Sequence, residues 1–349
     1  MRVLYPISID RWSYSLTNVL REIALRSPDM QFYSFSNPLL EEDRRLGEQF
    51  WAHPHIHPIR QRNLLTRSFD IVHYRAVTPQ SLAAVALAWA RSGGRGQRIF
   101  TAASIPPDFP VYHQYQAAVH LADVLIAVSK AVAESIREQF GRTVDAVIPN
   151  GAALDFFDPA AAHPLDASLN LTQPYVLFVG VLTWNKRPDV VLKLATLLPD
   201  LCFVLVGGAF SDEERTTYAQ QIAALPNVRY LGLQPRATVR DLMAHAAALV
   251  FPSQREGLPL TVIEAIAMGL PVLAQPRSSL PELVHAGLTG WLLPVDQPEA
   301  WASRLQTIIN WTAHERRHFA QRARAHAVEH YGWDSIARQY RALYQRAHP

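Results

Sequence analysis

The chain has 349 residues, of which 49% are hydrophobic and 18% are charged, and its formal net charge is +3. This length is typical of two domains, and the composition excludes a disordered or coiled-coil protein. The small positive charge does not indicate nucleic-acid binding. The single cysteine, Cys202, excludes a disulfide framework. The N-terminus does not resemble a signal peptide, and the longest apolar helical run, residues 82–90, is too short to span a bilayer, so we expect a soluble, cytosolic protein.

Short apolar runs alternate with helical patterns along the first half of the chain. This alternation predicts an α/β architecture with mostly parallel sheets. The predicted strands are 2–7, 31–35, 70–74, 98–102, 124–128 and 144–148, and the predicted helices are 13–26, 80–90, 112–122 and 130–140.

The second half repeats this pattern after a connector. Residues 152–173 contain two prolines and many small residues without a clear period, as expected for a segment between domains. The strands predicted after it are 175–179, 202–206, 228–231, 249–252 and 271–274. From Trp333 onward the apolar residues form a helical stripe, which predicts a last helix that packs either on its own domain or on the first one.

Two carboxylates, Glu256 and Glu264, stand eight positions apart in E-G-L-P-L-T-V-I-E. The stretch follows a strand-like run and opens a short helix that Gly269 closes. Backbone amides at a helix N-terminus form an anion site because they lack intrahelical partners. Two solvated acids beside an ordinary turn are the simpler interpretation of this spacing. The alternative is a ligand with a phosphate at one end and hydroxyls at the other, such as a nucleotide sugar.

The surroundings of this stretch carry a family resemblance. Residues 252–272, P-S-Q-R-E-G-L-P-L-T-V-I-E-A-I-A-M-G-L-P-V, resemble the signature of glycosyltransferase family 4, whose members are retaining enzymes. The resemblance implies the GT-B fold, in which two Rossmann-like, doubly wound domains face a cleft. It places an acceptor-side domain at residues 1–165, a donor domain at 166–330 and a C-terminal helix at 331–349 that crosses back to the first domain.

The resemblance also implies roles for individual residues. Glu264 matches the glutamate that binds the ribose, and Glu256 matches the one near the donor sugar, where it helps to stabilise charge at the anomeric carbon. The N–H groups of Leu258, Leu260 and Thr261 would face the distal phosphate.

A second set of residues is expected at the diphosphate. In G-V-L-T-W-N-K-R-P, residues 180–188, Lys186 matches the family lysine that neutralises the leaving group. The family arginine is replaced by Val181, so Arg187 is a candidate to supply the missing charge. Gly180 and Gly207 end two strands at the same edge of the sheet, where backbone can approach a pyrophosphate closely.

The first half departs from the family pattern. The segments F-D-I-V-H-Y-R, A-D-V-L-I-A-V-S-K and I-P-N-G resemble family segments. However, Ala103 stands where members carry a histidine near the sugar, and Ala153 replaces an aspartate that often follows I-P-N-G. His73 at a strand end and His113 are candidates to substitute for the missing histidine, and a packing or surface histidine is the alternative for each.

The resemblance implies a retaining transfer of a sugar from a nucleoside diphosphate to an acceptor hydroxyl, with no cofactor and no metal. Residues 53–58, H-P-H-I-H-P, invite a metal interpretation, but the two prolines favour an irregular or extended segment. Residues 316–346 carry seven arginines, which suits either a solvated helix face or peripheral contact with anionic lipid at the inner face of the membrane. Two other functions stay open: a nucleotide-sugar epimerase, and a non-catalytic protein that binds nucleotide sugars. The base, the sugar, the acceptor and the oligomeric state are not fixed by the sequence.

Overall fold

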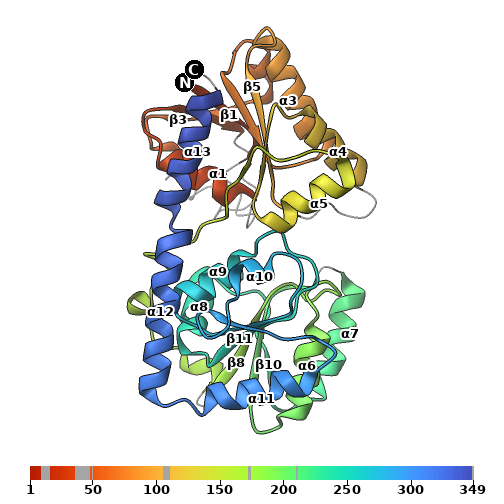
Figure 1. Cartoon of the computed structure of the whole chain (residues 1–349), viewed down its shortest axis with the longest axis vertical. Coiled ribbons are helices and arrows are strands. Elements are labelled where there is room, and N and C mark those ends of the chain that lie inside the picture. Colours follow the sequence, from red (N-terminus) through yellow and green to blue (C-terminus); the bar gives the residue numbers. More distant parts are fainter. Residues whose placement is uncertain are drawn as a thin grey trace. The chain divides into compact units, whose positions relative to one another are not determined.

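The computed structural model describes residues 1–8, 16–35, 48, 50–104, 111–171, 174–209 and 211–347. The chain divides into two compact units (Figure 1). Unit 1 contains Met1–Gly151 and Trp333–Pro349, and unit 2 contains Ala152–Gly332. The expected ranges placed the division after residue 165, so the connector residues 152–165 belong with the second unit.

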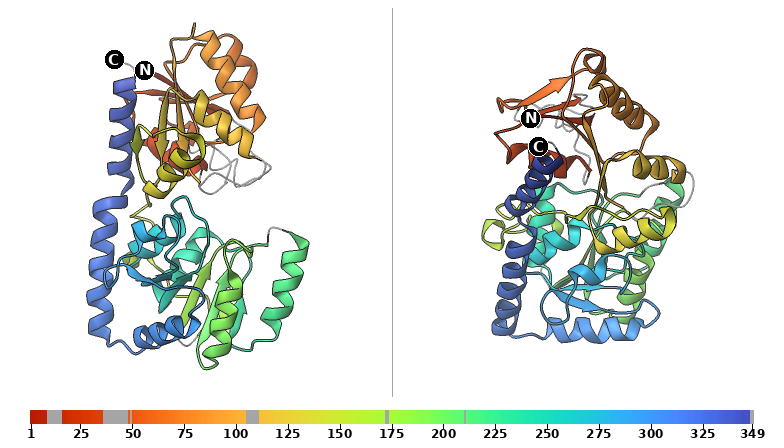
Figure 2. Two further views of the ribbon diagram at one scale, coloured as in Figure 1. Left: turned by 45° about the vertical axis from the view of Figure 1, so that its right-hand side comes forward. Right: turned by 45° about the horizontal axis from the view of Figure 1, so that its top comes forward.

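In the described residues of unit 1, seven strands form one sheet in the order β3-β2-β1-β4-β5-β6-β7, and every neighbouring pair is parallel. Helices separate most of the strands along the chain (Figure 2). The strands are β1 Arg2–Ser8, β2 Gln31–Phe35, β3 Ile56–Ile59, β4 Ile71–Tyr74, β5 Gln97–Ala102, β6 Val124–Ala127 and β7 Ala146–Val147. The helices are α1 Leu16–Leu25, α3 Pro79–Arg91, α4 Tyr112–Leu121, α5 Lys130–Phe140 and α13 Trp333–Ala347, with the 3₁₀ turn η1 Gln61–Leu65.

Unit 2 has a six-stranded sheet in its described part, in the order β10-β9-β8-β11-β12-β13, again with parallel neighbours only. Its strands are β8 Tyr175–Val179, β9 Cys202–Val206, β10 Val228–Tyr230, β11 Ala248–Phe251, β12 Val272–Ala274 and β13 Gly290–Leu292. Its helices are α6 Pro188–Leu197, α7 Asp212–Ala223, α8 Arg236–His245, α9 Leu260–Ala267, α10 Leu280–Leu283, α11 Pro298–Ile309 and α12 Ala313–Tyr331, with η2 Pro159–Ala161 and η3 Ala167–Leu169. The two parallel sheets confirm the expected α/β class.

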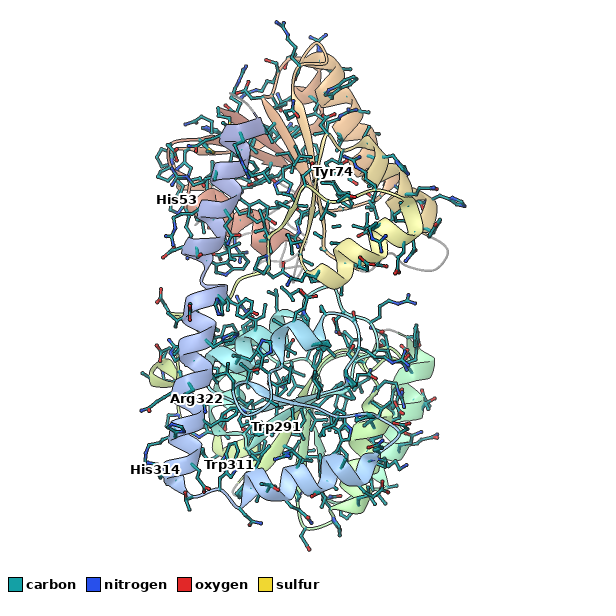
Figure 3. All side chains as sticks on the ribbon, viewed as in Figure 1. His53, Tyr74, Trp291, Trp311, His314 and Arg322 are labelled. Atoms are coloured by element: carbon teal, nitrogen blue, oxygen red, sulfur yellow. The ribbon has the colours of Figure 1, made fainter. Side chains whose placement is uncertain are left out.

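The central strands are buried on both faces, as parallel sheets with helices on both sides require. All four residues of β4 and of β11 are buried. In unit 2 aromatic side chains attach α12 to the sheet, where Trp291 of β13 and Trp311, both labelled in Figure 3, pack on Phe319. Such aromatic contacts add to the stabilisation that burial gives.

The last two helices belong to different units. A capping box between Thr312 and Glu315 starts α12, which packs on α9 of unit 2. Helix α13 begins at Trp333 and packs on α1 of unit 1, with its apolar stripe buried. Three of the arginines considered for lipid contact bind inside the chain: Arg316 donates to Ile308 O, Arg324 pairs with Asp158, and Arg341 pairs with Asp29. No described helix is long and apolar enough to cross a membrane.

Two strands were not predicted from the sequence. Residues 56–59 form β3 at the edge of the first sheet, although Pro58 lies within it. An edge strand tolerates proline because one of its sides needs no ladder hydrogen bonds. Residues 290–292 form β13 at the edge of the second sheet. Three residues are too few for a reliable period-two pattern.

Candidate active site

A short loop after β11 forms the centre of the candidate site. It joins the carboxyl end of β11 to the start of α9, at the edge where open parallel sheets bind ligands. The buried side chain of Gln275 fixes the start of the loop, because its Nε2 donates to Pro252 O at 2.7 Å and to Ser253 O at 2.5 Å. Ser278 fixes the middle: its Oγ accepts from Glu256 N at 2.9 Å and donates to Glu256 O.

Glu256 and Lys186 meet in this loop. Lys186 Nζ donates to Glu256 Oε1 at 2.5 Å, and the Oγ of Ser253 lies 2.5 Å from the same oxygen. The carboxylate is 11% exposed and the ammonium 23%, so the pair is partly shielded from water. The lysine also lies over the ring of Phe251, with Nζ 5.1 Å from the ring centroid. The site therefore holds a cation and an anion side by side on two loops of one sheet edge.

The N-terminus of α9 faces this loop without a cap. Its N-cap residue is Pro259, and no side chain caps the helix. The first N–H groups of a helix have no intrahelical acceptor, and Leu260 and Thr261 hold these positions, so their contact with a phosphate stays a prediction. The N–H of Leu258 lies just before the helix. Leu258 already interacts with another part of the chain, so we do not count its N–H as free.

Glu264 lies one turn into α9, where the guanidinium of Arg236 donates to its Oε1 at 3.0 Å. Burial raises the pKa of Glu264 to about 7, and the nearby positive charge of Arg236 opposes this rise. The arginine lies over the rings of Phe156 and Phe157, at 5.3 and 5.1 Å from their centroids. Arg236 was not among the residues identified from the sequence.

Glycine backbone forms the neighbouring part of the edge. Gly207 has φ +145°, and a Cβ there would stand 1.9 Å from the carbonyl oxygen of Gly180. Leu182 N donates to Gly208 O, and Gly207 N donates to Gly232 O, so the loops after β8, β9 and β10 are joined by backbone hydrogen bonds. Glycine at 207 is thus needed for the close approach of two backbones.

The diphosphate part of the resemblance is weaker in three dimensions. Val181, which stands where the family arginine is expected, is 37% exposed. Arg187, the candidate to replace that charge, is bound by Asp189 through Nε at 2.9 Å and Nη2 at 2.8 Å. Its positive charge is therefore largely matched within the chain. Trp184 in the same loop is 62% exposed.

Backbone conformation also marks this edge. Among the described non-glycine residues, three have a positive φ, and two of them, Arg187 at 54° and Ser278 at 57°, belong to the loops described above. Such conformations cost energy and cluster at functional sites.

His73, the candidate catalytic histidine of the first half, does not suit that role. The side chain lies in unit 1 with 0% exposure, its Nδ1 is 2.5 Å from Tyr344 Oη, and its Nε2 is 2.8 Å from Thr101 Oγ1. Burial, with a smaller effect of the Arg75 charge, lowers the pKa of His73 well below its usual value. Both ring nitrogens are occupied by packing partners, so we correct the earlier assignment and omit His73 from the site.

Several other site residues had no signal in the sequence. Ser253, Gln275 and Ser278 act through contacts between loops, and such residue types are common in any turn. Among the described residues, no group of three or more histidine, cysteine, aspartate or glutamate side chains could hold a metal ion.

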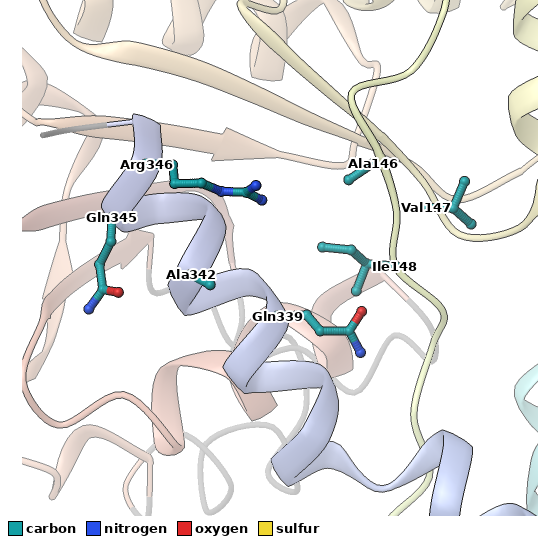
Figure 4. A pocket seen from close by; sticks show the side chains of 7 residues that line it. All are labelled: Ala146, Val147, Ile148, Gln339, Ala342, Gln345 and Arg346. Carbon is teal, nitrogen blue, oxygen red and sulfur yellow. The ribbon is translucent and has the colours of Figure 1, made fainter.

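A separate groove of about 600 Å³ lies in unit 1 between β7 and α13 (Figure 4). It is lined by Ala146, Val147, Ile148, Gln339, Ala342, Gln345 and Arg346. None of the residues predicted for the site lines this groove.

Comparison with known proteins identifies the family. The model of the glycosyl transferases group 1 matches residues 164–326, and that of Glycosyltransferase Family 4 matches residues 24–156. The chain belongs to this glycosyltransferase family. A D-inositol 3-phosphate glycosyltransferase of Mycobacterium avium is 31% identical over 242 residues, which are 66% of this chain and 57% of that protein. The D-inositol 3-phosphate glycosyltransferase of Mycobacterium tuberculosis is 29% identical over 66% of this chain and 50% of its own length. The chain thus spans about half the length of these relatives.

Solved structures confirm the GT-B fold. HepE of Anabaena, crystallised with UDP and glucose, has a TM-score of 0.82 at 20% identity and covers 99% of this chain and 100% of its own. A glycosyltransferase of Rickettsia africae reaches 0.78 at 17% identity, with 99% and 98% covered. A sucrose-phosphate synthase of Thermosynechococcus elongatus reaches 0.75 at 19% identity, with 99% of each chain covered.

Proposed function

We propose that this glycosyltransferase moves a sugar from a nucleoside diphosphate sugar to an acceptor hydroxyl, with retention at the anomeric carbon. The observation that carries the proposal is the contact between Lys186 and Glu256 beside the uncapped start of α9. A cation, an anion and free helix N–H groups at one edge suit a ligand with a diphosphate next to a sugar. The structure of HepE with UDP-glucose supports uracil as the base.

Each residue has a distinct task in this proposal. Lys186 and the N–H groups of Leu260 and Thr261 bind the diphosphate and neutralise the charge that grows on it as the glycosidic bond breaks. Glu256 faces the sugar, where its charge favours the positive charge that develops at the anomeric carbon. Glu264 accepts hydrogen bonds from the ribose hydroxyls. We assign no protein nucleophile and no bound cofactor or metal to the reaction.

Binding and catalysis need separate tests, because a non-catalytic protein would keep the same donor site. A thermal-shift panel of UDP, GDP, ADP, TDP and CDP, with and without common sugars attached, should show stabilisation by one nucleotide class. Nuclear magnetic resonance of the product made from that donor should show the anomeric configuration of the donor. An inverted product would refute retention, and a donor that stabilises the chain but is never consumed would support a binding protein instead.

An epimerase is the weaker alternative. Such a reaction needs acid and base groups at the sugar, and His73, the candidate to replace the missing family histidine near the sugar, is buried inside unit 1. Analysis of the products by nuclear magnetic resonance distinguishes this case too, since an epimerase would convert the nucleotide sugar without releasing the nucleotide.

A further inference from the structure

A buried arginine in unit 1 lacks the partner that such a residue normally has. Arg75 directly follows β4 and is 3% exposed. Its Nη2 donates to Asn150 Oδ1 at 3.2 Å, whereas Nε and Nη1 are buried and have no hydrogen-bond partner in the described structure. An arginine side chain keeps its charge in proteins, so the orphaned N–H groups belong to a cation.

The groups around this guanidinium are neutral. No described acidic side chain forms an ion pair with Arg75. The titratable groups that act on it are the hydroxyls of Tyr340, Tyr344 and Tyr115, and Tyr340 also forms a side-chain hydrogen bond with it. Burial raises the pKa values of all three, so they stay protonated. His73, two residues earlier, is held neutral by the lowering of its pKa.

Another arginine of the same sheet shows the usual arrangement. Arg98 of β5 binds Asp123 with Nε at 2.9 Å and Nη2 at 2.6 Å. A buried charge without such a partner costs several kcal/mol, and hydrogen bonds to hydroxyls offset only part of this. A bound anion would supply the missing charge at Arg75 and accept from Nε and Nη1. The surrounding hydroxyls could donate to it, because a hydroxyl is both donor and acceptor.

The position of Arg75 fits a substrate rather than a structural ion. It stands at the carboxyl end of β4, which lies between β1 and β5 inside the sheet. This is the edge at which open parallel sheets bind ligands. Its partner Asn150 lies next to Gly151, where the chain leaves unit 1.

We propose that Arg75 binds an anionic group, a phosphate monoester or a carboxylate, of the acceptor substrate. The identification of the anion's carrier as the acceptor substrate rests on the proposed function. The anion site itself does not. The Nε and Nη1 groups of Arg75 are buried, so the covering side chains must move aside when the anion enters.

The test separates this site from the donor site. Lys186→Ala removes the main donor-site cation, and phosphate or acetate is then added at constant ionic strength while Tm is followed. We expect one of these anions to raise Tm by several degrees through mass action. A second substitution in the Lys186→Ala chain, Arg75→Met, should abolish this rise in Tm. The control substitution Arg91→Met in the same chain removes an exposed arginine at the end of α3 and should leave the rise intact.

Three results would overturn the proposal: no stabilisation of the Lys186→Ala chain by either anion, an equal rise after Arg75→Met, or an equal rise after Arg75→Lys, which keeps the charge but loses the planar fork. The lysine variant decides the question if the methionine variant does not fold. A purely structural role for Arg75 predicts a lower Tm with an unchanged anion response.

The source of the anion is decided on the wild-type chain. The binding of glucose 6-phosphate and of glucuronate is compared with that of glucose. If one charged sugar binds at least tenfold more tightly than glucose, its charged group, phosphate or carboxylate, is the anion that the site prefers. Equal binding of all three overturns the proposal for a sugar-borne anion. The Tm response of the wild-type chain to nucleoside diphosphates tests the proposed function independently. If nucleoside diphosphates do not raise Tm but phosphate still does so through Arg75, the proposed donor is rejected and the anion site is retained.

Discussion

Removing Arg236 should change the pH at which the donor binds. Burial raises the pKa of Glu264 from 4.5 to about 7, although Arg236, 3.0 Å away, favours the ionised form. At 1.36 kcal/mol per pKa unit, this rise disfavours the carboxylate by about 3 kcal/mol. Because the pKa is raised on folding, the folding stability from this proton is complete below pH 4.5 and is lost as the pH rises through 7.

The proposed ribose contact needs the ionised Glu264. Binding of a nucleotide sugar should then release a proton, so affinity should fall about tenfold per pH unit below 7 and level off above it. Arg236→Met removes the attraction that opposes the rise, so the midpoint of this profile should move to higher pH. Affinity at pH 7 should fall and should recover in alkaline buffer. Arg236→Lys should retain most of the wild-type profile.

Calorimetric titration with the nucleotide sugar from pH 6 to 9 measures this directly. A nucleotide sugar is preferable to a free nucleoside diphosphate, whose terminal phosphate titrates near pH 6. Glu264→Gln is the matched variant, since it keeps the shape of the side chain and cannot titrate. The reasoning is refuted if Glu264→Gln keeps the wild-type pH profile, or if Arg236→Met leaves the midpoint where it was.

Three further changes test the donor edge. Lys186→Ala should lower the rate of donor turnover by about 10² to 10³, the usual effect of losing one charge-stabilising group, and steady-state kinetics would contradict the assignment if kcat stayed within twofold. Gly207→Ala places a Cβ 1.9 Å from Gly180 O and should lower the free energy of unfolding in urea by about 3 kcal/mol. The control Gly141→Ala, at φ +64° with no atom within 4 Å of the new Cβ, should lower it by about 1 kcal/mol. Equal losses for the two glycines would show that the close approach is not what requires Gly207. Val181→Arg restores the family cation at an exposed position and should lower the donor KM about fivefold, for about 1 kcal/mol of added attraction. An unchanged KM would mean that the diphosphate lies elsewhere.

The architecture was predictable because it depends on local patterns. Buried parallel strands read as apolar runs, and the division into two sheets followed from the order of those runs. The edge strand β3 was missed because Pro58 argues against a strand unless its edge position is known. The meeting of Lys186 and Glu256 was partly predictable, since both follow strands of one parallel sheet.

The remaining contacts depend on tertiary structure. Ser278 reaches Glu256 across 22 positions, and Arg236 reaches Glu264 across 28, so neither shows a local signal. An arginine at the start of a helix is usually solvated. His73 could equally have faced a ligand from its strand end. It is buried because tyrosines of α13, about 270 positions away, cover that part of the sheet.

Consumption of a nucleotide sugar without acceptor is the most direct test of the central claim, because glycosyltransferases transfer slowly to water. The chain is incubated with the nucleotide sugar that stabilises it, and release of the nucleoside diphosphate is followed by chromatography. We predict slow release by the wild-type chain and a fall to background with Lys186→Ala. Tight binding with no release, or release that is unchanged in the Lys186→Ala chain, would contradict the account.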